Sequence, residues 1–241
     1  MKREELLKIA KPILFNTEMV QAILEGRKTV TRRVVKLDLG LADTDKHDSS
    51  WLKIPDEYGD YHDAKDLCRY KVGDILYIRE TWSFISCDEC IENEIHRDFT
   101  PGCNISDERK DSYKGKYGCF VYRTNYGTTE DDTFPPSMFK WKPSIHMPKK
   151  IARIFLKVTD IRVERLQDIT VGDIENEGYP GEIDFSTMPV AMQGIMFEWW
   201  VSTWNSTIKK QDLDKYGWKA NPWVWVIEFE KMEKTKRRIL G

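Results

Sequence analysis

The segment Trp223–Phe229 (WVWVIEF) constrains the fold more than any other part of this sequence. It is rich in β-branched and aromatic residues, and apolar side chains fall on both faces of the strand that it would form. A strand that is apolar on both faces is buried on both sides, whereas an exposed strand alternates between apolar and polar residues. We therefore expect a central strand close to the C-terminus, with a sheet built around it.

Further segments have the periodicity of strands or helices. Strands are predicted where β-branched and apolar residues alternate, at Arg27–Lys36, Asp74–Trp82, Cys119–Arg123 and Ile151–Arg165. Helices are predicted where apolar residues recur every three or four positions, at Glu18–Gly26, Leu166–Glu177 and Met192–Asn205. Thr170 is the expected N-cap of the second helix, with Asp173 completing a capping box. Many strands and few helices predict an α+β protein with a mostly antiparallel sheet or a small barrel.

The length and composition favour one domain. A chain of 241 residues with 40% hydrophobic and 12% aromatic residues has ample material for a core and is not disordered. We expect a single domain over residues 1–241, with polar insertions at about 38–70 and 83–117.

The net charge of −2 argues against a protein that is basic overall, but the charges are segregated. Residues 1–36 carry nine basic and four acidic side chains, and residues 138–165 carry eight basic and two acidic ones. Residues 83–134 carry six basic and eleven acidic side chains. The two basic segments can form a local basic face, although an ordinary solvated surface explains the pattern equally well.

No stretch has the length and apolar character of a signal peptide or a membrane span. The odd count of five cysteines fits reduced thiols. We expect a cytoplasmic protein with no membrane partner.

The most informative motif is the segment 26–33, GRKTVTRR. Side chains alternate along a strand, so Thr29, Thr31 and Arg33 point to one face while Lys28 and Arg32 point to the other. Closely spaced cations and hydroxyls after a helix suit an anion, and a hydroxyl near an amine of lowered pKa suits nucleophilic chemistry. A solvated basic strand edge is the alternative interpretation.

Five segments in this order resemble the ASCH family, and more closely its longer, prophage-associated branch. They are ILEGRKTVTRR, YKVGDILYIRETW, the stretch from WKPSIHMPKK to LQDIT, GDIENEGY and NPWVWVIEFE. The resemblance implies a PUA-like small β-barrel with flanking helices. It also implies a protein directed at RNA, DNA or a nucleotide.

A branch of short bacterial N(4)-acetylcytidine amidohydrolases is similar at three catalytic positions. The resemblance places its lysine and threonine at Lys28 and Thr31, and its glutamate at Glu177. Lys28 would deprotonate Thr31, the threonine would attack the acyl carbon, and Glu177 would carry a proton to the leaving amine. This chain departs from that branch in its length and in having Arg32 where an apolar residue is usual. Alternatively, Lys28 contacts phosphate and Glu177 simply ends its helix.

Several other residues are candidates for ligand binding. The cations of the motif are suited to phosphate, an arginine can also bind a guanine edge, a tryptophan can stack on a base, and a histidine between prolines can donate to a ligand oxygen. These candidates are Arg27, Arg32, Arg33, Arg79, Glu80, Trp82, Ser144 and His146. A buried arginine–glutamate pair, a core tryptophan and a structural histidine are the alternatives for Arg79 with Glu80, for Trp82 and for His146.

Four cysteines are candidate metal ligands. Cys87 and Cys90 have the spacing of half a zinc site, with Cys103 and Cys119 downstream at a spacing that does not repeat it. A structural zinc would hold a segment too polar to fold around its own core. Plain reduced thiols are the alternative, and the activity itself requires no cofactor.

Three functions remain open from the sequence. The first is binding of RNA, DNA or a modified nucleobase in a basic cleft with Lys28, Arg32 or Arg33 at its mouth. The second is amidohydrolysis of an N-acylated nucleoside, with Lys28, Thr31 and Glu177 converging in partly exposed positions. The third is a nuclease.

Overall fold

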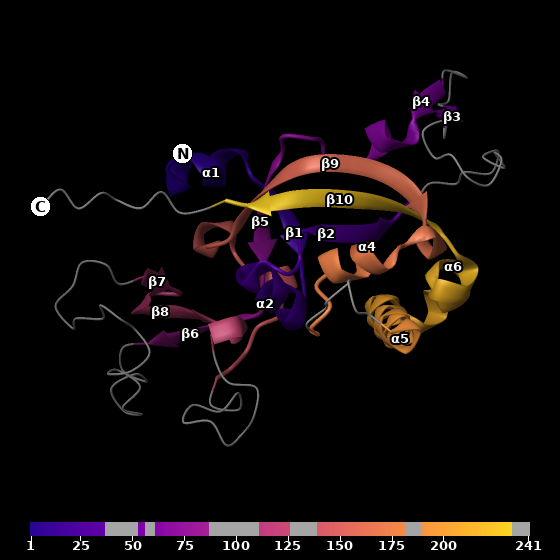
Figure 1. Cartoon of the computed structure of the whole chain (residues 1–241). Coiled ribbons are helices and arrows are strands. Elements are labelled where there is room, and N and C mark those ends of the chain that lie inside the picture. The colour runs from indigo at the N-terminus through magenta and orange to yellow at the C-terminus, as the bar shows by residue number, and fades with distance from the viewer. Residues whose placement is uncertain (37–52, 56–60, 87–110, 126–138, 182–188, 233–241) are drawn as a thin grey trace, which may run out of the picture. The chain divides into compact units, whose positions relative to one another are not determined.

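The computed structural model describes residues 1–36, 53–55, 61–86, 111–125, 139–181 and 189–232 (Figure 1). Its helices and strands, in chain order, are α1 (Arg3–Ile9), β1 (Lys11–Leu14), α2 (Thr17–Glu25), β2 (Val30–Val34), β3 (Lys53–Pro55), β4 (Tyr61–Asp63), β5 (Ile75–Arg79), β6 (Trp82–Ser86), β7 (Asp111–Tyr113), β8 (Lys116–Tyr122), β9 (Phe155–Arg165), α4 (Val171–Asn176), α5 (Val190–Thr207), α6 (Leu213–Tyr216) and β10 (Trp223–Lys231). The predicted α+β class is confirmed.

The chain divides into two compact units. The first comprises residues 1–11, 22–76 and 154–241, and the second comprises residues 12–21 and 77–153. The prediction of a single domain stays a prediction.

Strand β10 is central in the largest sheet, as its two apolar faces predict. The strand order is β1-β5-β9-β10-β2, and β10 is antiparallel to both β9 and β2. Val226 of β10 pairs with Arg32 on β2 and with Arg162 on β9. Residues paired directly across a sheet share a face, so the two arginines flank Val226 on the same side.

Four of the five predicted strands belong to this sheet, as β2, β5, β9 and β10. Within the described ranges no pairing joins β1 to β2, so these two are the edge strands there and the PUA-like barrel stays a prediction.

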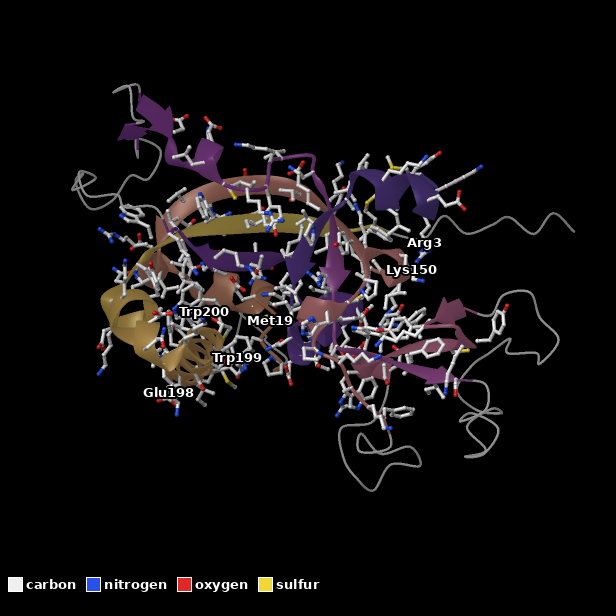
Figure 2. The ribbon with its side chains drawn as sticks, turned by 180° about the vertical axis from the view of Figure 1, so that it is seen from behind. Arg3, Met19, Lys150, Glu198, Trp199 and Trp200 are labelled. Carbon is white, nitrogen blue, oxygen red and sulfur yellow. The ribbon has the colours of Figure 1, made fainter. Side chains whose placement is uncertain are left out.

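Helices α4 and α5 cover the face of β2, β9 and β10 that carries Val226 (Figure 1). The core between them is apolar and fully buried, and consists of Val30, Leu166, Ile169, Ile174, Met196, Trp200, Trp204, Val224 and Val226. Trp200 lies on the side of α5 turned toward the sheet, and Glu198 lies on the opposite side (Figure 2). The predicted aromatic helix is thereby confirmed, with α5 extending from Val190 to Thr207.

The predicted start of α4 is also confirmed. The Thr170 hydroxyl accepts a hydrogen bond from the Asp173 amide at 3.2 Å, and the Asp173 carboxylate accepts one from the Thr170 amide at 3.0 Å. This reciprocal capping satisfies amides that the first turn of a helix leaves unpaired. Because α4 ends at Glu177, its C-cap, the capping box also fixes the position of that residue.

The second unit contains the three-stranded sheet β6-β8-β7. The sequence predicted one strand over Asp74–Trp82, and that prediction is wrong. β5 ends at Arg79, and β6 starts at Trp82 in the other sheet. The break falls at Glu80, whose buried carboxylate is held by Arg153.

Two other predicted boundaries also shift. The expected insertion at 83–117 begins and ends in strands, because β6, β7 and the start of β8 fall inside it, while residues 87–110 lie outside the described part. The strand predicted from Ile151 begins at Phe155, because Pro148 leads into a short 3₁₀ helix at Lys149–Ile151.

Removing the cap of α4 tests whether this helix depends on it. We expect Thr170→Ala to lower the free energy of unfolding by about 1 kcal/mol, because the Asp173 amide loses its partner. Urea denaturation followed by circular dichroism measures the change. Thr170→Ser keeps the hydroxyl and is expected to stay within about 0.5 kcal/mol of the parent protein. Equal losses in the two variants would contradict a capping role for the hydroxyl.

Candidate functional site

Lys28 and Glu177 form a buried ion pair in the first unit. They are 149 residues apart, and the Lys28 Nζ lies 2.5 Å from the Glu177 Oε2 and 2.9 Å from its carbonyl oxygen. Their side chains are 0% and 3% exposed. The sequence placed these residues in one site only through the family resemblance, and the structure brings them into direct contact.

The backbone around the pair explains how two distant segments meet. Gly26 ends α2 with a φ of +83°, and Lys28 then forms an isolated antiparallel bridge with Glu177. Gly178 has a φ of +98°, and a Cβ there would lie 2.9 Å from the Cβ of Ala22 and 3.1 Å from that of Lys28. Glycine tolerates both the positive φ and this close approach. The end of α4 therefore packs directly against the end of α2.

Arg32 binds the other oxygen of the same carboxylate. Its guanidinium donates to the Glu177 Oε1 at 3.2 Å, and it also pairs with Glu164 at 3.3 Å and Asp173 at 3.4 Å. The Arg32 side chain is 0% exposed. Lys28 and Arg32 are thus buried and paired with carboxylates instead of standing at the mouth of a basic cleft.

Arg162 extends the network across the sheet. It lies beside Arg32 on the face covered by α4, where it pairs with Glu164, with Asp173 at 3.4 Å and with Glu228. Sequence reasoning missed this extension. Its signal is the Arg162-x-Glu164 spacing, which puts opposite charges on one face of a strand.

Burial lowers the pKa of Lys28 from its ordinary value of 10.5, because the ammonium is removed from water. The contact with Glu177 opposes this change, and the nearby charges of Arg33 and Arg32 add to it. For Asp173, burial raises the pKa, but the hydrogen bonds from Thr170 and the charges of Arg32 and Arg162 outweigh it, so that the pKa is lowered overall.

Thr31 lies on β2 between Val30 and Arg32 and is 3% exposed. Val30 packs into the core under α4 and α5, and Arg32 reaches Glu177, so alternation turns Thr31 and Arg33 to the other face of β2. Lys28 precedes the strand, and the charges of Arg33 and Arg32 both lower the pKa of its amine. The approach of the Thr31 hydroxyl to Glu177 stays a prediction.

The remaining cations of the motif differ in their surroundings. Arg27 donates to the carbonyl oxygens of Gly178 at 2.7 Å and Tyr179 at 3.2 Å, so it ties the end of α2 to the end of α4. Arg33 is half-buried, and burial lowers its pKa, with Tyr70 and Glu177 opposing the change.

The other candidate residues belong to the second unit. Arg79 donates to the Ile145 carbonyl, which lies in the short 3₁₀ helix Ser144–His146. Ser144 is half-buried and His146 is exposed.

Glu80 is buried in the second unit, and Arg153 binds it through two nitrogens at 2.8 Å each. Thr124 also donates to it at 3.0 Å. Trp82 is buried beneath the Lys142 ammonium. Glu80 is thus the acid of a buried arginine–glutamate pair, and its partner is Arg153.

Of the four candidate metal ligands, Cys87, Cys90 and Cys103 lie outside the described residues. Cys119 is half-buried on β8. In the part of the chain that the structure describes, no group of three or more His, Cys, Asp or Glu residues is arranged to hold a metal ion. Nor does any helix there have the length and apolar character needed to cross a membrane.

Replacing Glu177 tests how much the buried pair contributes to the free energy of unfolding. We expect Glu177→Gln to lower the free energy of unfolding by about 3 kcal/mol, because it leaves Lys28 buried without its counter-charge. The matched control is Glu175→Gln in the same helix, expected to change stability by less than about 0.5 kcal/mol. Urea denaturation of both variants measures the difference, and similar losses would contradict the importance of the pair.

The lowered pKa of Lys28 gives a pH dependence of known sign. Just below pH 10.5 the unfolded chain binds a proton at Lys28 that the folded chain binds less well, so folding becomes more favourable as the pH rises through this window. We expect the stability of the parent protein relative to Lys28→Met to increase from pH 8 toward pH 10.5 in urea denaturation series. A flat or falling difference would mean that the pKa of Lys28 is not lowered.

No model of a known family matches the chain, and no curated protein or solved structure matches it either. The resemblance to the ASCH family therefore rests on the sequence segments that carry it.

Proposed function

We propose that this chain is an ASCH-type protein with a PUA-like barrel, and that it hydrolyses the N-acyl group of a modified nucleobase or nucleoside with Lys28, Thr31 and Glu177. The observation that carries the proposal is the 2.5 Å contact between Lys28 and Glu177 across 149 residues of sequence. Secondary structure alone does not require these two residues to meet, because a helix that ends at Glu177 can face in any direction.

The surroundings of the pair support acid–base chemistry. A lysine whose pKa is lowered by burial and by neighbouring cations supplies a neutral amine more readily than an exposed lysine. Glu177 has one oxygen on Lys28 and the other on Arg32, so its carboxylate is fixed in orientation. A fixed acid beside a base of lowered pKa is the arrangement that amide cleavage needs.

The reaction proceeds in two halves. The Lys28 ammonium first passes a proton to the Glu177 carboxylate that it contacts. The neutral amine then takes the proton of the Thr31 hydroxyl, the oxygen attacks the acyl carbon, and the C–N bond breaks as the Glu177 carboxylic acid gives its proton to the leaving nitrogen. Water then attacks the acyl–threonine ester and gives a proton to Glu177, while Lys28 returns a proton to the Thr31 oxygen, which releases the carboxylic acid and restores the hydroxyl. A proton passing from Glu177 to Lys28 restores the ion pair. The sum is one amide and one water converted into one acid and one amine.

Burial of the site adds a requirement. Thr31 is 3% exposed and Lys28 is 2% exposed, so an acyl group reaches them only when neighbouring segments move aside. In a site without water, the charge that develops on the amide oxygen is stabilised more strongly by fixed cations than it would be in solution.

The site supports hydrolysis better than it supports binding of a nucleic acid by Lys28 and Arg32. Phosphate binding needs free donors, and carboxylates already occupy donors of Lys28 and Arg32. The sheet supports the fold part of the proposal, because it contains β2, β5, β9 and β10, which are four of the five strands predicted from the sequence.

The test is turnover of N-acetylated cytidine, adenosine and guanosine by the full chain, with the free nucleoside measured by chromatography. We expect at least one acylated nucleoside to be hydrolysed. Thr31→Ala is expected to lower kcat at least about a thousandfold, as loss of a nucleophile does in other hydrolases.

Two variants serve as controls. Thr31→Ser keeps a hydroxyl and is expected to retain measurable turnover. Thr29→Ala removes the exposed threonine two positions earlier and is expected to leave kcat within about threefold of the parent value. The proposal fails if no acylated nucleoside is turned over, or if Thr31→Ala is as active as the parent protein.

A further inference from the structure

The three-stranded sheet of the second unit carries aromatic residues on one face. Its register pairs Phe84 with Phe120 and Trp82 with Tyr122, and Tyr113 with Lys116. Alternation places all of these on one face. We name the rings of Trp82, Phe84, Tyr113 and Phe120 the aromatic face; their centroids lie 5.1–5.9 Å from one another along the face.

Both faces of the sheet contain buried residues. Ser83, Ile85 and Val121 on the opposite face are 2%, 8% and 4% exposed, and Trp82 and Ser86 on the face with the rings are 1% and 2% exposed. Three rings of the aromatic face, Phe84, Tyr113 and Phe120, are only half-buried. The exposed parts of these three neighbouring rings form apolar surface gathered in one place, which is typical of a binding surface.

One detail supports a ligand beside the rings. Trp82 is 1% exposed, yet its indole nitrogen has no hydrogen-bond partner among the described residues. A buried indole N–H ordinarily finds an acceptor.

Three lysines lie close to the rings or on the same face of the sheet. The Lys142 Nζ lies 4.6 Å from the Trp82 ring and 4.4 Å from the Tyr113 ring. Lys114 lies 5.8 Å from the Tyr113 ring, and Lys116 is exposed on the same face of the sheet. Within the described ranges, no carboxylate pairs with these three lysines.

We infer that the aromatic face, with Lys114, Lys116 and Lys142, binds single-stranded nucleic acid. Aromatic rings stack on unpaired bases, and ammonium groups at their border neutralise the phosphates of the same strand. A polyanion without bases matches the cations and leaves the rings unused, whereas an apolar partner leaves the cations unpaired. This surface is separate from the proposed hydrolysis, so a chain that deacylates no nucleoside still binds the strand.

The test is fluorescence anisotropy of a labelled 12-nucleotide single strand titrated with the full chain at several salt concentrations. We expect binding that weakens as salt rises, with Phe84→Leu and Phe120→Leu each lowering the affinity at least about fivefold, because a stacked base contributes on that scale. Leucine keeps an apolar side chain at each position, and thermal unfolding confirms that the variants are folded.

The cations are tested in a separate variant. Replacing Lys114, Lys116 and Lys142 together with glutamine is expected to flatten the slope of log affinity against log salt by about 2, since each phosphate contact contributes about 0.7 for single strands. The matched control is Lys219→Gln, an exposed lysine of the first unit, which is expected to leave the slope unchanged.

An abasic strand of the same length separates stacking from charge. We expect it to bind at least about tenfold more weakly than the parent strand. The inference is overturned if the parent strand does not bind at about 100 µM protein, the weak limit of non-specific binding. It is equally overturned if the abasic strand binds as tightly, or if the leucine variants bind as the parent protein does.

Discussion

The burial of Glu177 between Lys28 and Arg32 is the interaction on which the arrangement of the first unit depends. Taking an ion out of water has an effective penalty of several kcal/mol, and only close partners of opposite charge offset it. Each of the two oxygens of Glu177 has its own cation, at 2.5 and 3.2 Å. The end of α4, the end of α2 and the strand β2 therefore hold one another in fixed positions.

Several local features of the sequence bring Glu177 into contact with Lys28. Thr170 and Asp173 set where α4 begins, and its short length then places Glu177 at its end. Gly26 turns the chain out of α2, and Gly178 lets the two helix ends approach. A buried charged network of this kind is weak evidence for added stability and stronger evidence for a specified geometry. In this chain the specified geometry puts an amine of lowered pKa beside a fixed carboxylate.

The two units distribute polar and apolar residues in opposite ways. In the first, the sheet face that carries Arg32, Arg162 and Glu164 is covered by α4 and α5, so that charges lie beside a core. In the second, one face of a small sheet carries aromatic rings beside the Lys142 ammonium group. Each departure from the usual pattern of a sheet marks the place where we propose a function.

The sequence by itself determined the elements whose signals are local. The apolar faces of Trp223–Phe229 predicted a central strand, and Thr170 with Asp173 predicted the start of a helix; both depend on neighbours only a few residues away. Tertiary structure alone decided which charges meet. Glu177 finds Lys28 across 149 residues, and Glu80 pairs with Arg153 instead of its neighbour Arg79, interrupting the strand predicted through that position. Alternation along a strand gives the face of a side chain but not its partner, because the partner is set by how distant segments pack and by the free energy of leaving a charge unpaired.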